Sequence, residues 1–174
     1  MLILIGASAS GKTEIAKLLI KNHGFEKLVT TTTREMRPGE VNGIDYNFVS
    51  AEDFFKKKEE NGFFETVIYN ENYYGTPKEC KDNNVLIVDP IGANNIFKNS
   101  EGHMFIVLTT DESVRKERML SRGDSLAHTI ERLNHDREHF ELGKMIHYDY
   151  SIDTTNRTLN DLSVEINKLY KRVE

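Results

Sequence analysis

The stretch "MLILIGASASGKTEIAKLL" at residues 1–19 decides the fold, because it joins an apolar strand, a loop of small residues and a helix. The run "LILI" at 2–5 is too apolar for a strand with one face in water, so it predicts a strand inside a parallel sheet. Apolar residues then recur at helical spacing over 13–22, and Gly24 predicts the end of that helix. The loop between strand and helix, residues 6–13, matches G-x-x-x-x-G-K-[ST].

This loop predicts a site for the phosphates of a nucleoside triphosphate. Its members are Gly6, Ala7, Ser8, Ala9, Ser10, Gly11, Lys12 and Thr13. Small side chains let successive backbone N–H groups surround phosphate oxygens, and the start of the helix adds free donors and partial positive charge. We expect Lys12 to reach the β- and γ-phosphates and the Thr13 hydroxyl to meet Mg²⁺. A chance glycine-rich turn is the alternative, but the strand before the loop and the helix after it argue against one.

The rest of the chain alternates short apolar runs with helical segments. Further strands are predicted within 27–33 and at 63–69, 84–89, 103–109 and 148–153, and further helices at 51–61, 112–122, 125–143 and 159–172, with another beginning at Pro90. This alternation predicts an α/β fold of the P-loop type, with a five-stranded parallel sheet and helices on both of its faces. The block at 30–76 breaks the alternation and predicts an inserted subdomain.

Length and composition predict one ordinary globular domain. The chain has 174 residues, 38% hydrophobic and 29% charged, which is enough for one real core. A net charge of −5 argues against a general binder of nucleic acid or membrane surfaces. Cys80 is the only cysteine, which excludes an internal disulfide and fits a reducing compartment. The sequence shows neither a signal peptide nor an apolar run of 18 residues, so we expect a cytoplasmic protein.

A second group of residues predicts a second anion site. Arg34 and Arg37 lie three positions apart, and Tyr46 and Tyr74 follow in the same block. One guanidinium group can bind two phosphate oxygens at once, and tyrosine hydroxyls can complete such a site. Glu65 accepts hydrogen bonds but cannot donate them when ionised, so it suits a base that presents N–H groups.

This block resembles the GMP-binding region of guanylate kinases, whose pattern runs T-T-R-x-x-R-P-G-E-x-x-G-x-D-Y-x-F, then F-x-E, then Y-Y-G-T/S. The resemblance covers most of the chain and is densest over 30–76. It implies that the phosphate of GMP is bound by Arg34, Arg37, Tyr46 and Tyr74. It also implies that Glu65 takes the guanine N1 and N2 hydrogens, that Thr76 meets the base, and that Thr30 replaces the usual Ser with its hydroxyl kept.

The resemblance extends to a lid. The strings "ERMLSRGD" at 117–124 and "IERLNHDRE" at 130–138 are similar to the arginine-bearing lid of the family. By this analogy the phosphoryl group in transfer is neutralised by Mg²⁺, Lys12, Arg34, Arg37, Arg118, Arg122 and Arg132. The implied division is a core of 1–29, 77–119 and 146–174, a GMP-binding subdomain of 30–76 and a lid of 120–145.

One strand departs from the family pattern. The family writes it L-D-I-D-x-Q-G, whereas this chain has "LIVDPIGA" at 86–93, with Ile87 and Ile91 in place of the first Asp and the Gln. Asp89 is therefore the remaining candidate for a water-mediated contact with Mg²⁺. The effect of the two isoleucines on metal binding and specificity is left open by the sequence.

The resemblance implies the reaction ATP + GMP ⇌ ADP + GDP with Mg²⁺, with dGMP as a second acceptor. ATP and GMP are the expected partners, rather than nucleic acid or membrane, and the chain is expected to be a monomer or a homodimer. A kinase for another nucleoside monophosphate or a ribose bisphosphate is an alternative. A non-catalytic binding module is another, although Lys12 and Thr13 favour an enzyme. A zinc hydrolase is a third, because "HDREH" at 135–139 matches H-x-x-E-H on a helix.

Overall fold

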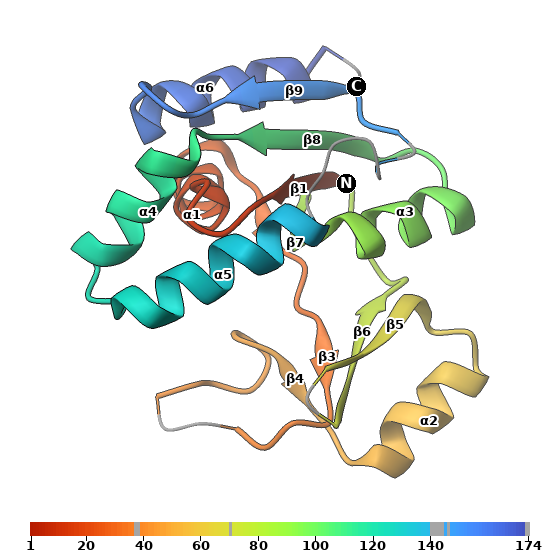
Figure 1. The fold of residues 1–174 in the computed structure, drawn as a ribbon. Coiled ribbons are helices and arrows are strands. Elements are labelled where there is room, and N and C mark those ends of the chain that lie inside the picture. The colour runs from red at the N-terminus through yellow and green to blue at the C-terminus, as the bar shows by residue number, and fades with distance from the viewer. Residues whose placement is uncertain (37–38, 70, 140–144, 146, 173–174) are drawn as a thin grey trace.

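The computed structural model describes residues 1–36, 39–69, 71–139, 145 and 147–172. Its strands are β1 Leu2–Gly6, β2 Glu26–Lys27, β3 Thr31–Thr32, β4 Asn47–Phe48, β5 Phe63–Tyr69, β6 Asn72–Pro77, β7 Asn84–Val88, β8 Met104–Thr109 and β9 Tyr150–Asp153. Its helices are α1 Lys12–His23, α2 Ala51–Glu59, α3 Pro90–Asn99, α4 Glu112–Ser121, α5 Leu126–His139 and α6 Leu159–Tyr170. Figure 1 shows a larger sheet in the upper half of the view and a smaller one in the lower half, with α5 between them.

The larger sheet is parallel throughout and has the order β2-β7-β1-β8-β9. This confirms the predicted five-stranded parallel core. Strand β1 lies in the centre, and all five of its residues are buried. Because the strands are parallel, their carboxyl ends share one edge, and the loop after β1 lies at that edge.

Alternate residues of β1 face two separate cores. Leu2 and Leu4 pack with residues of α1 and α6 on one face, whereas Ile3 and Ile5 pack with residues of α3 on the other. Helices therefore cover both faces, as the uninterrupted apolar run predicted. Figure 1 shows α1 and α6 together on one side of the sheet and α3 on the other.

Local capping explains where the helices begin and end. The Ser50 hydroxyl accepts a hydrogen bond from the Asp53 N–H at the start of α2, and Thr158 caps α6 in the same way through Asp161. Gly24 ends α1 in the left-handed conformation, with φ of 78°. These caps lie where the sequence patterns predicted helix boundaries.

The segment after α1 forms a second, four-stranded sheet with the order β4-β3-β6-β5. Strands β3 and β6, and β6 and β5, pair antiparallel, while β3 and β4 pair parallel. Helix α2 packs on this sheet through Phe54, whose ring stacks on Phe63 with centroids 4.8 Å apart. Two of these strands, β4 and β6, were not predicted from the sequence. The expected strand over 27–33 divides into β2 and β3, which belong to different sheets.

Candidate functional site

The loop of residues 6–13 connects β1 to α1 and depends on two glycines. A Cβ on Gly6 would lie 2.7 Å from the Leu108 carbonyl oxygen, so the close approach of loop and β8 requires glycine. Gly11 precedes α1 with φ of 98°, a conformation that L side chains rarely adopt. The Ser10 hydroxyl is buried and has no hydrogen-bond partner within the described part of the chain. The two glycines therefore fix the course of the loop at the edge of the sheet, and the Ser10 hydroxyl lies buried within it.

Lys12 lies at the start of α1 and turns back over this loop. Its Nζ donates to the carbonyl oxygens of Gly6 at 2.5 Å and Ala7 at 2.8 Å. Burial lowers the pKa of Lys12 to about 8; the charge of Asp136 opposes this change, and those of Arg132 and Arg115 add to it. A group that brings negative charge to the loop would restore the ordinary pKa.

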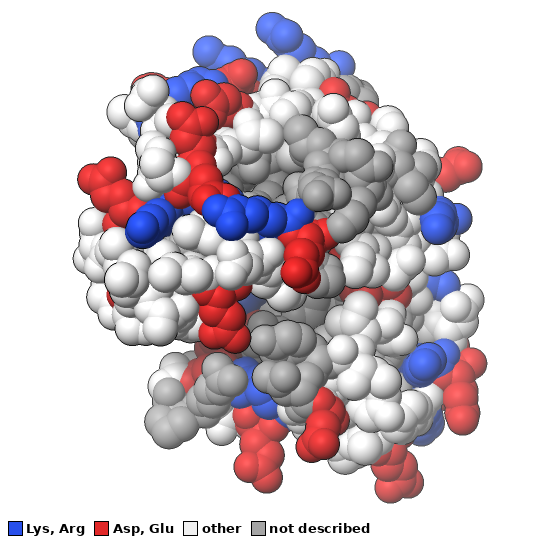
Figure 2. Space-filling model, in the orientation of Figure 1, with Lys and Arg blue, Asp and Glu red and all other residues white. Residues whose placement is uncertain are grey.

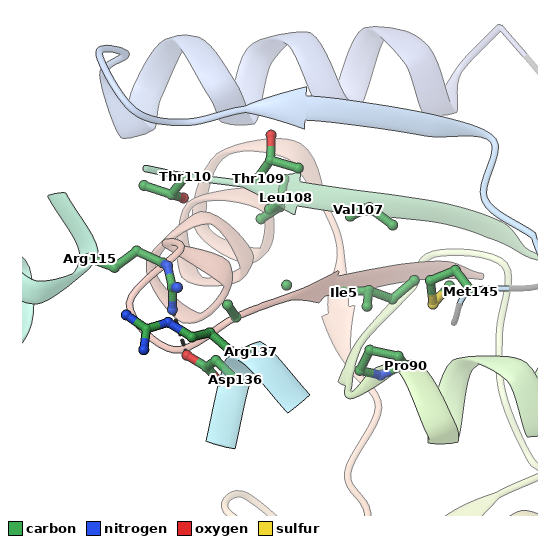
Figure 3. A pocket seen from close by; sticks show the side chains of 12 residues that line it. Ile5, Pro90, Val107, Leu108, Thr109, Thr110, Arg115, Asp136, Arg137 and Met145 are labelled. Atoms are coloured by element: carbon green, nitrogen blue, oxygen red, sulfur yellow. Dashed lines mark hydrogen bonds and ion pairs between the residues drawn. The ribbon is translucent and has the colours of Figure 1, made fainter. Parts of the chain in front are cut away.

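The loop also binds a side chain that the sequence did not single out. Asp136, on α5, accepts hydrogen bonds from the Ser8 backbone N–H at 2.9 Å and from the Ser8 hydroxyl at 3.2 Å. The same carboxylate pairs with the Arg115 guanidinium, on α4, at 2.5 Å. Figure 3 shows the two side chains meeting from separate helices. Arg115, Arg118 and Arg122 follow a helical i, i+3, i+7 spacing, which could have revealed Arg115; Asp136 carried no comparable signal.

A cavity of about 460 Å³ opens beside this ion pair, at the carboxyl ends of β1 and β8. Its lining includes Gly6 and Ala7 from the loop, Thr109 and Thr110 after β8, and Arg137 from α5. Figure 3 shows the polar residues at one end of the cavity and the apolar ones, among them Ile5 and Val107, toward the other. Arg137 also pairs with Glu112 of α4, which connects the two helices.

A second cleft, of about 900 Å³, lies between the two sheets. It gathers the described residues that the sequence predicted for GMP: Thr30, Arg34, Tyr46, Glu65, Tyr74 and Thr76. The predicted residues Asp89 and Arg132 line the same cleft. Arg37 lies outside the described residues. The predicted acceptor residues are therefore neighbours in space, although 46 positions separate Thr30 from Thr76 in the chain.

Arg34 is held in this cleft by a carboxylate and an aromatic wall. Its Nη2 donates to Glu40 at 2.7 Å, and its guanidinium carbon lies 5.5 Å from the ring centroids of both Tyr46 and Phe48. The hydrogen bond to Glu40 is the main reason that the pKa of Arg34 is raised, and Tyr74 contributes in the same direction. The guanidinium is thus a fixed cation that remains charged at any physiological pH.

Glu65 and Thr76 form a pair across β5 and β6. The Thr76 hydroxyl donates to Glu65 Oε1 at 2.7 Å, whereas Glu65 Oε2 is buried with no hydrogen-bond partner among the described residues. Burial raises the pKa of Glu65, and the nearby charge of Asp89 adds to this. A register shift between Phe63 and Glu65 places Glu65, rather than Phe64, opposite Thr76. The unpaired oxygen is an acceptor that lacks a donor.

Asp89 has a structural role in addition to its place in the cleft. It follows β7, and its Oδ1 accepts a hydrogen bond of 2.7 Å from the Gly92 N–H, which caps α3. Pro90 begins the helix, as predicted. Ile87 and Ile91 are 37% and 51% exposed and line the same cleft, so this wall is apolar on either side of Asp89.

The arginines predicted for the lid divide into two groups. Arg118 donates to the carbonyl oxygens of Ala9 at 3.2 Å and Thr154 at 2.8 Å, so it ties the phosphate loop to the end of β9. Arg122 and Arg132 both approach Asp124, at 2.5 Å and 3.7 Å. Of these three arginines, only Arg132 lines the cleft between the two sheets.

Zinc chemistry gains no support from the structure. Within the described part of the chain, His, Cys, Asp and Glu side chains form no group of three or more that could hold a metal ion. His135 lines the cleft between the two sheets, and the side chain of His139 lies outside the described residues.

No described helix has the length and apolar character needed to cross a membrane. On the face shown in Figure 2, basic and acidic side chains are interspersed.

Comparisons with known proteins show what the chain resembles in sequence and in fold. The family model described as "Guanylate kinase" matches residues 1–171. A guanylate kinase of Wolinella succinogenes is 35% identical over 99% of this chain and 86% of its own, and one of Clostridium acetobutylicum is 31% identical over 97% and 83%. A crystal structure of guanylate kinase from Anaplasma phagocytophilum covers 99% of this chain and 84% of that chain, with a TM-score of 0.67 at 24% identity. That likeness shows the fold.

Proposed function

The chain belongs to the guanylate kinase family, and from this premise we propose that it transfers the γ-phosphoryl group of ATP to GMP. An oxygen of the GMP phosphate attacks the γ-phosphorus, and the bond from that phosphorus to the β,γ-bridging oxygen breaks. The products are ADP and GDP. We propose dGMP as a second acceptor, since no residue assigned to the base or phosphate requires a 2′-hydroxyl.

The observation that carries this proposal is the buried Glu65 carboxylate, whose Oε2 lacks a partner among the described residues. A carboxylate only accepts hydrogen bonds, so its natural partner is a ring that presents adjacent N–H groups. Guanine offers N1–H and N2–H on one edge. The fixed charge of Arg34 lies in the same cleft and suits the 5′-phosphate of the same nucleotide. Both ends of GMP therefore find complementary groups.

On the donor side, the loop of residues 6–13 supports binding of the ATP phosphates. Lys12 is placed to meet the β- and γ-phosphates. Arg132 lines the acceptor cleft, and its charge acts on Lys12, so it is suited to the phosphoryl group that passes between the two nucleotides. We propose neutralising roles for Arg34, Arg37, Arg118 and Arg122 as well. For this role Arg118 must exchange its hydrogen bonds to Ala9 and Thr154, and Arg122 its ion pair with Asp124, for contacts with phosphate oxygens.

The donor set is compatible with Mg²⁺. This ion commonly takes one or two protein oxygens and completes its octahedron with water and substrate phosphates. Thr13, exposed at the start of α1, offers a hydroxyl, and Asp89, exposed in the cleft, retains an oxygen beyond the one that caps α3. Bound with ATP, the ion would neutralise charge on the transferring phosphoryl group. Thr13 and Asp89 are the residues we propose to hold it.

We further propose that residues 30–76 act as the GMP-binding subdomain and 120–145 as a lid that closes over both nucleotides. Closure would exclude water, which would otherwise compete with GMP for the phosphoryl group. The cytoplasm, where ATP and GMP are available, is the proposed location. A monomer or a homodimer is compatible with this scheme.

A panel of acceptors tests the proposal. ADP release should be measured with ATP, Mg²⁺ and, in turn, GMP, dGMP, AMP, CMP, UMP and a ribose bisphosphate. We expect turnover with GMP and dGMP and at most about 10⁻⁴ of that kcat/KM with the others, because a base site built on hydrogen bonds rejects the wrong base strongly. Preference for any other acceptor would overturn the assignment of Glu65.

A further inference from the structure

Asp136 occupies hydrogen-bond donors of the loop of residues 6–13. The carboxylate is 3% exposed and uses both oxygens on the loop, one on the Ser8 N–H and one on the Ser8 hydroxyl. Backbone N–H groups of this loop are the donors that a phosphate would use. A carboxylate and a phosphate offer the same chemistry here: anionic oxygens that accept hydrogen bonds.

Arg115 strengthens the resemblance between this carboxylate and a bound anion. Its side chain is 8% exposed, its guanidinium approaches Asp136 at 2.5 Å, and its charge acts on Lys12. The Arg115 Nε is buried without a partner among the described residues, so its N–H is available to donate to another acceptor. A buried guanidinium needs an anion beside it. Asp136 of α5 is the nearer of its two carboxylate partners, at 2.5 Å, and Glu112 of α4 lies at 3.9 Å.

We propose that Asp136 is an internal substitute for a nucleotide phosphate, bound to Ser8 and Arg115 in the empty protein and displaced when ATP binds. The proposal rests on the loop of residues 6–13 being the ATP site, as argued above. Displacement transfers the Ser8 donors and the Arg115 charge to the incoming phosphate. Asp136 is thus a positioning residue that opposes ATP binding while it keeps the empty donor site ordered.

The test is the affinity for ATP. Isothermal titration should compare the unaltered protein with Asp136→Asn and with Glu131→Gln, an exposed residue of α5 whose loss changes the net charge equally. We expect Asp136→Asn to bind ATP at least about tenfold more tightly, which corresponds to about 1.4 kcal/mol, and Glu131→Gln to stay within about twofold. Equal or weaker binding by Asp136→Asn would overturn the proposal.

Thermal unfolding separates this role from a purely structural one. Asp136→Asn should lower the Tm of the empty protein, yet ATP should raise its Tm by more than it raises that of the unaltered protein. Loss of a residue that merely supports the fold would lower the Tm without ATP and the Tm with ATP by the same amount, and that result would contradict the proposal. If the unaltered protein binds no ATP, both the proposed function and this inference fail. If the unaltered protein binds ATP and phosphorylates GMP while Asp136→Asn gains no affinity for ATP, only this inference fails.

A second pair of variants covers the case in which Asp136→Asn fails to fold because the buried Arg115 keeps only its longer ion pair with Glu112, at 3.9 Å. Arg115→Gln and the double variant Arg115→Gln/Asp136→Asn differ only in the carboxylate. The double variant has lost both charges and should fold. It should bind ATP more tightly than Arg115→Gln by at least about fivefold, or about 1 kcal/mol. The same affinity in both would overturn the proposal.

Discussion

At the scale of single residues, Lys12 in the loop of residues 6–13 and Glu65 in the cleft between the sheets are ionisable groups whose charged forms are disfavoured by burial. Burial lowers the pKa of Lys12 to about 8 and raises that of Glu65. The two shifts have opposite directions but one cause, because burial favours the neutral form of either group. Substrates that supply the missing charge or donor would reverse both shifts. Perturbed groups of this kind are typical of functional sites, and in the proposed function each meets a different nucleotide.

Lys12 predicts a pH dependence for ATP binding. The phosphates require the charged amine, which the empty protein loses as pH rises through about 8. ATP should restore the charge, so binding takes up a proton above that pH, and affinity falls by up to about tenfold per pH unit. Calorimetry in two buffers with different ionisation enthalpies measures the uptake between pH 7.5 and 9.5.

Two variants serve as controls for this prediction. Lys12→Arg stays charged throughout the range, so it should lose the pH dependence even if it binds ATP more weakly. Lys12→Ala should abolish turnover. A pH profile that is the same in Lys12→Arg and in the unaltered protein would assign the titration to another group.

The role proposed for Glu65 predicts that its replacement weakens the binding of GMP but not that of ATP. Glu65→Gln replaces an acceptor with an amide donor that faces the guanine N–H groups, and the loss of charged hydrogen bonds is worth about 3 kcal/mol. The KM for GMP should therefore rise on the order of 10²-fold, while the KM for ATP stays within about twofold. Steady-state kinetics at saturating levels of the other substrate give both values.

The pKa shift of Glu65 adds a second readout. Because burial raises this pKa, a proton competes with GMP as pH falls through it, and the KM for GMP should rise toward acid pH in the unaltered protein. Glu65→Gln should not show this rise. Equal losses of ATP and GMP affinity in Glu65→Gln would contradict the assigned role.

At the scale of elements, α3 shows how one side chain can serve both the fold and the site. Asp89 caps α3 through the Gly92 N–H and also lines the acceptor cleft. Ile87 and Ile91 leave Asp89 as the carboxylate that this wall provides. The start of α3 therefore combines a stabilising contact with the proposed contact to Mg²⁺.

Two substitutions at Asp89 separate these contributions. Asn caps helices about as well as Asp, so Asp89→Asn should keep the free energy of unfolding within about 0.5 kcal/mol, whereas Asp89→Ala should lose about 1 kcal/mol. Both should need more Mg²⁺ for half-maximal turnover, because both lack the charge. Denaturant unfolding and a Mg²⁺ titration of turnover measure the two effects. An unchanged Mg²⁺ requirement in Asp89→Asn would leave Asp89 with the capping role alone.

At the scale of the whole molecule, the acceptor cleft lies between the two sheets and α5 contributes to its lining. Figure 1 shows α5 between the larger and the smaller sheet. Arg132 and His135 line that cleft from α5, while Asp136 and Arg137 line the cavity on the donor side. One helix thus forms part of both sites. A movement of α5 toward bound nucleotides would change both sites together, which suits a reaction that needs both substrates at once.

This arrangement predicts that the two nucleotides bind cooperatively. GMP with a non-hydrolysable ATP analogue should reduce the radius of gyration measured by small-angle scattering. Together they should also stabilise the protein by more than the sum of their separate effects, each worth about 2.7 kcal/mol at 100 times its Kd. Strictly additive stabilisation with unchanged scattering would contradict closure.

Much of the fold followed from local patterns. The uninterrupted apolar residues of β1 predicted a sheet covered on both faces, and Gly24 and Ser50 predicted helix ends that the structure confirms. Strand β6 was missed, because "NYYGTP" at 72–77 has neither alternation nor a long apolar run and exists through pairing with β3 and β5. The shift of register that brings Glu65 opposite Thr76 is equally invisible in the sequence.

By itself, the sequence determined the parallel sheet, the loop of residues 6–13 and the residue types proposed for the two nucleotide sites, because spacing and chemistry within short segments are enough to specify them. Only the tertiary structure decided that Asp136 binds Ser8 across 128 positions, that Arg115 pairs with it, and that Glu65 retains an oxygen without a partner among the described residues. Those features depend on burial and on contacts between segments that lie far apart in the chain, such as the loop of residues 6–13 and α5. Electrostatic partners of this kind arise from the packing of α4 and α5 on the loop, and no local pattern records that packing.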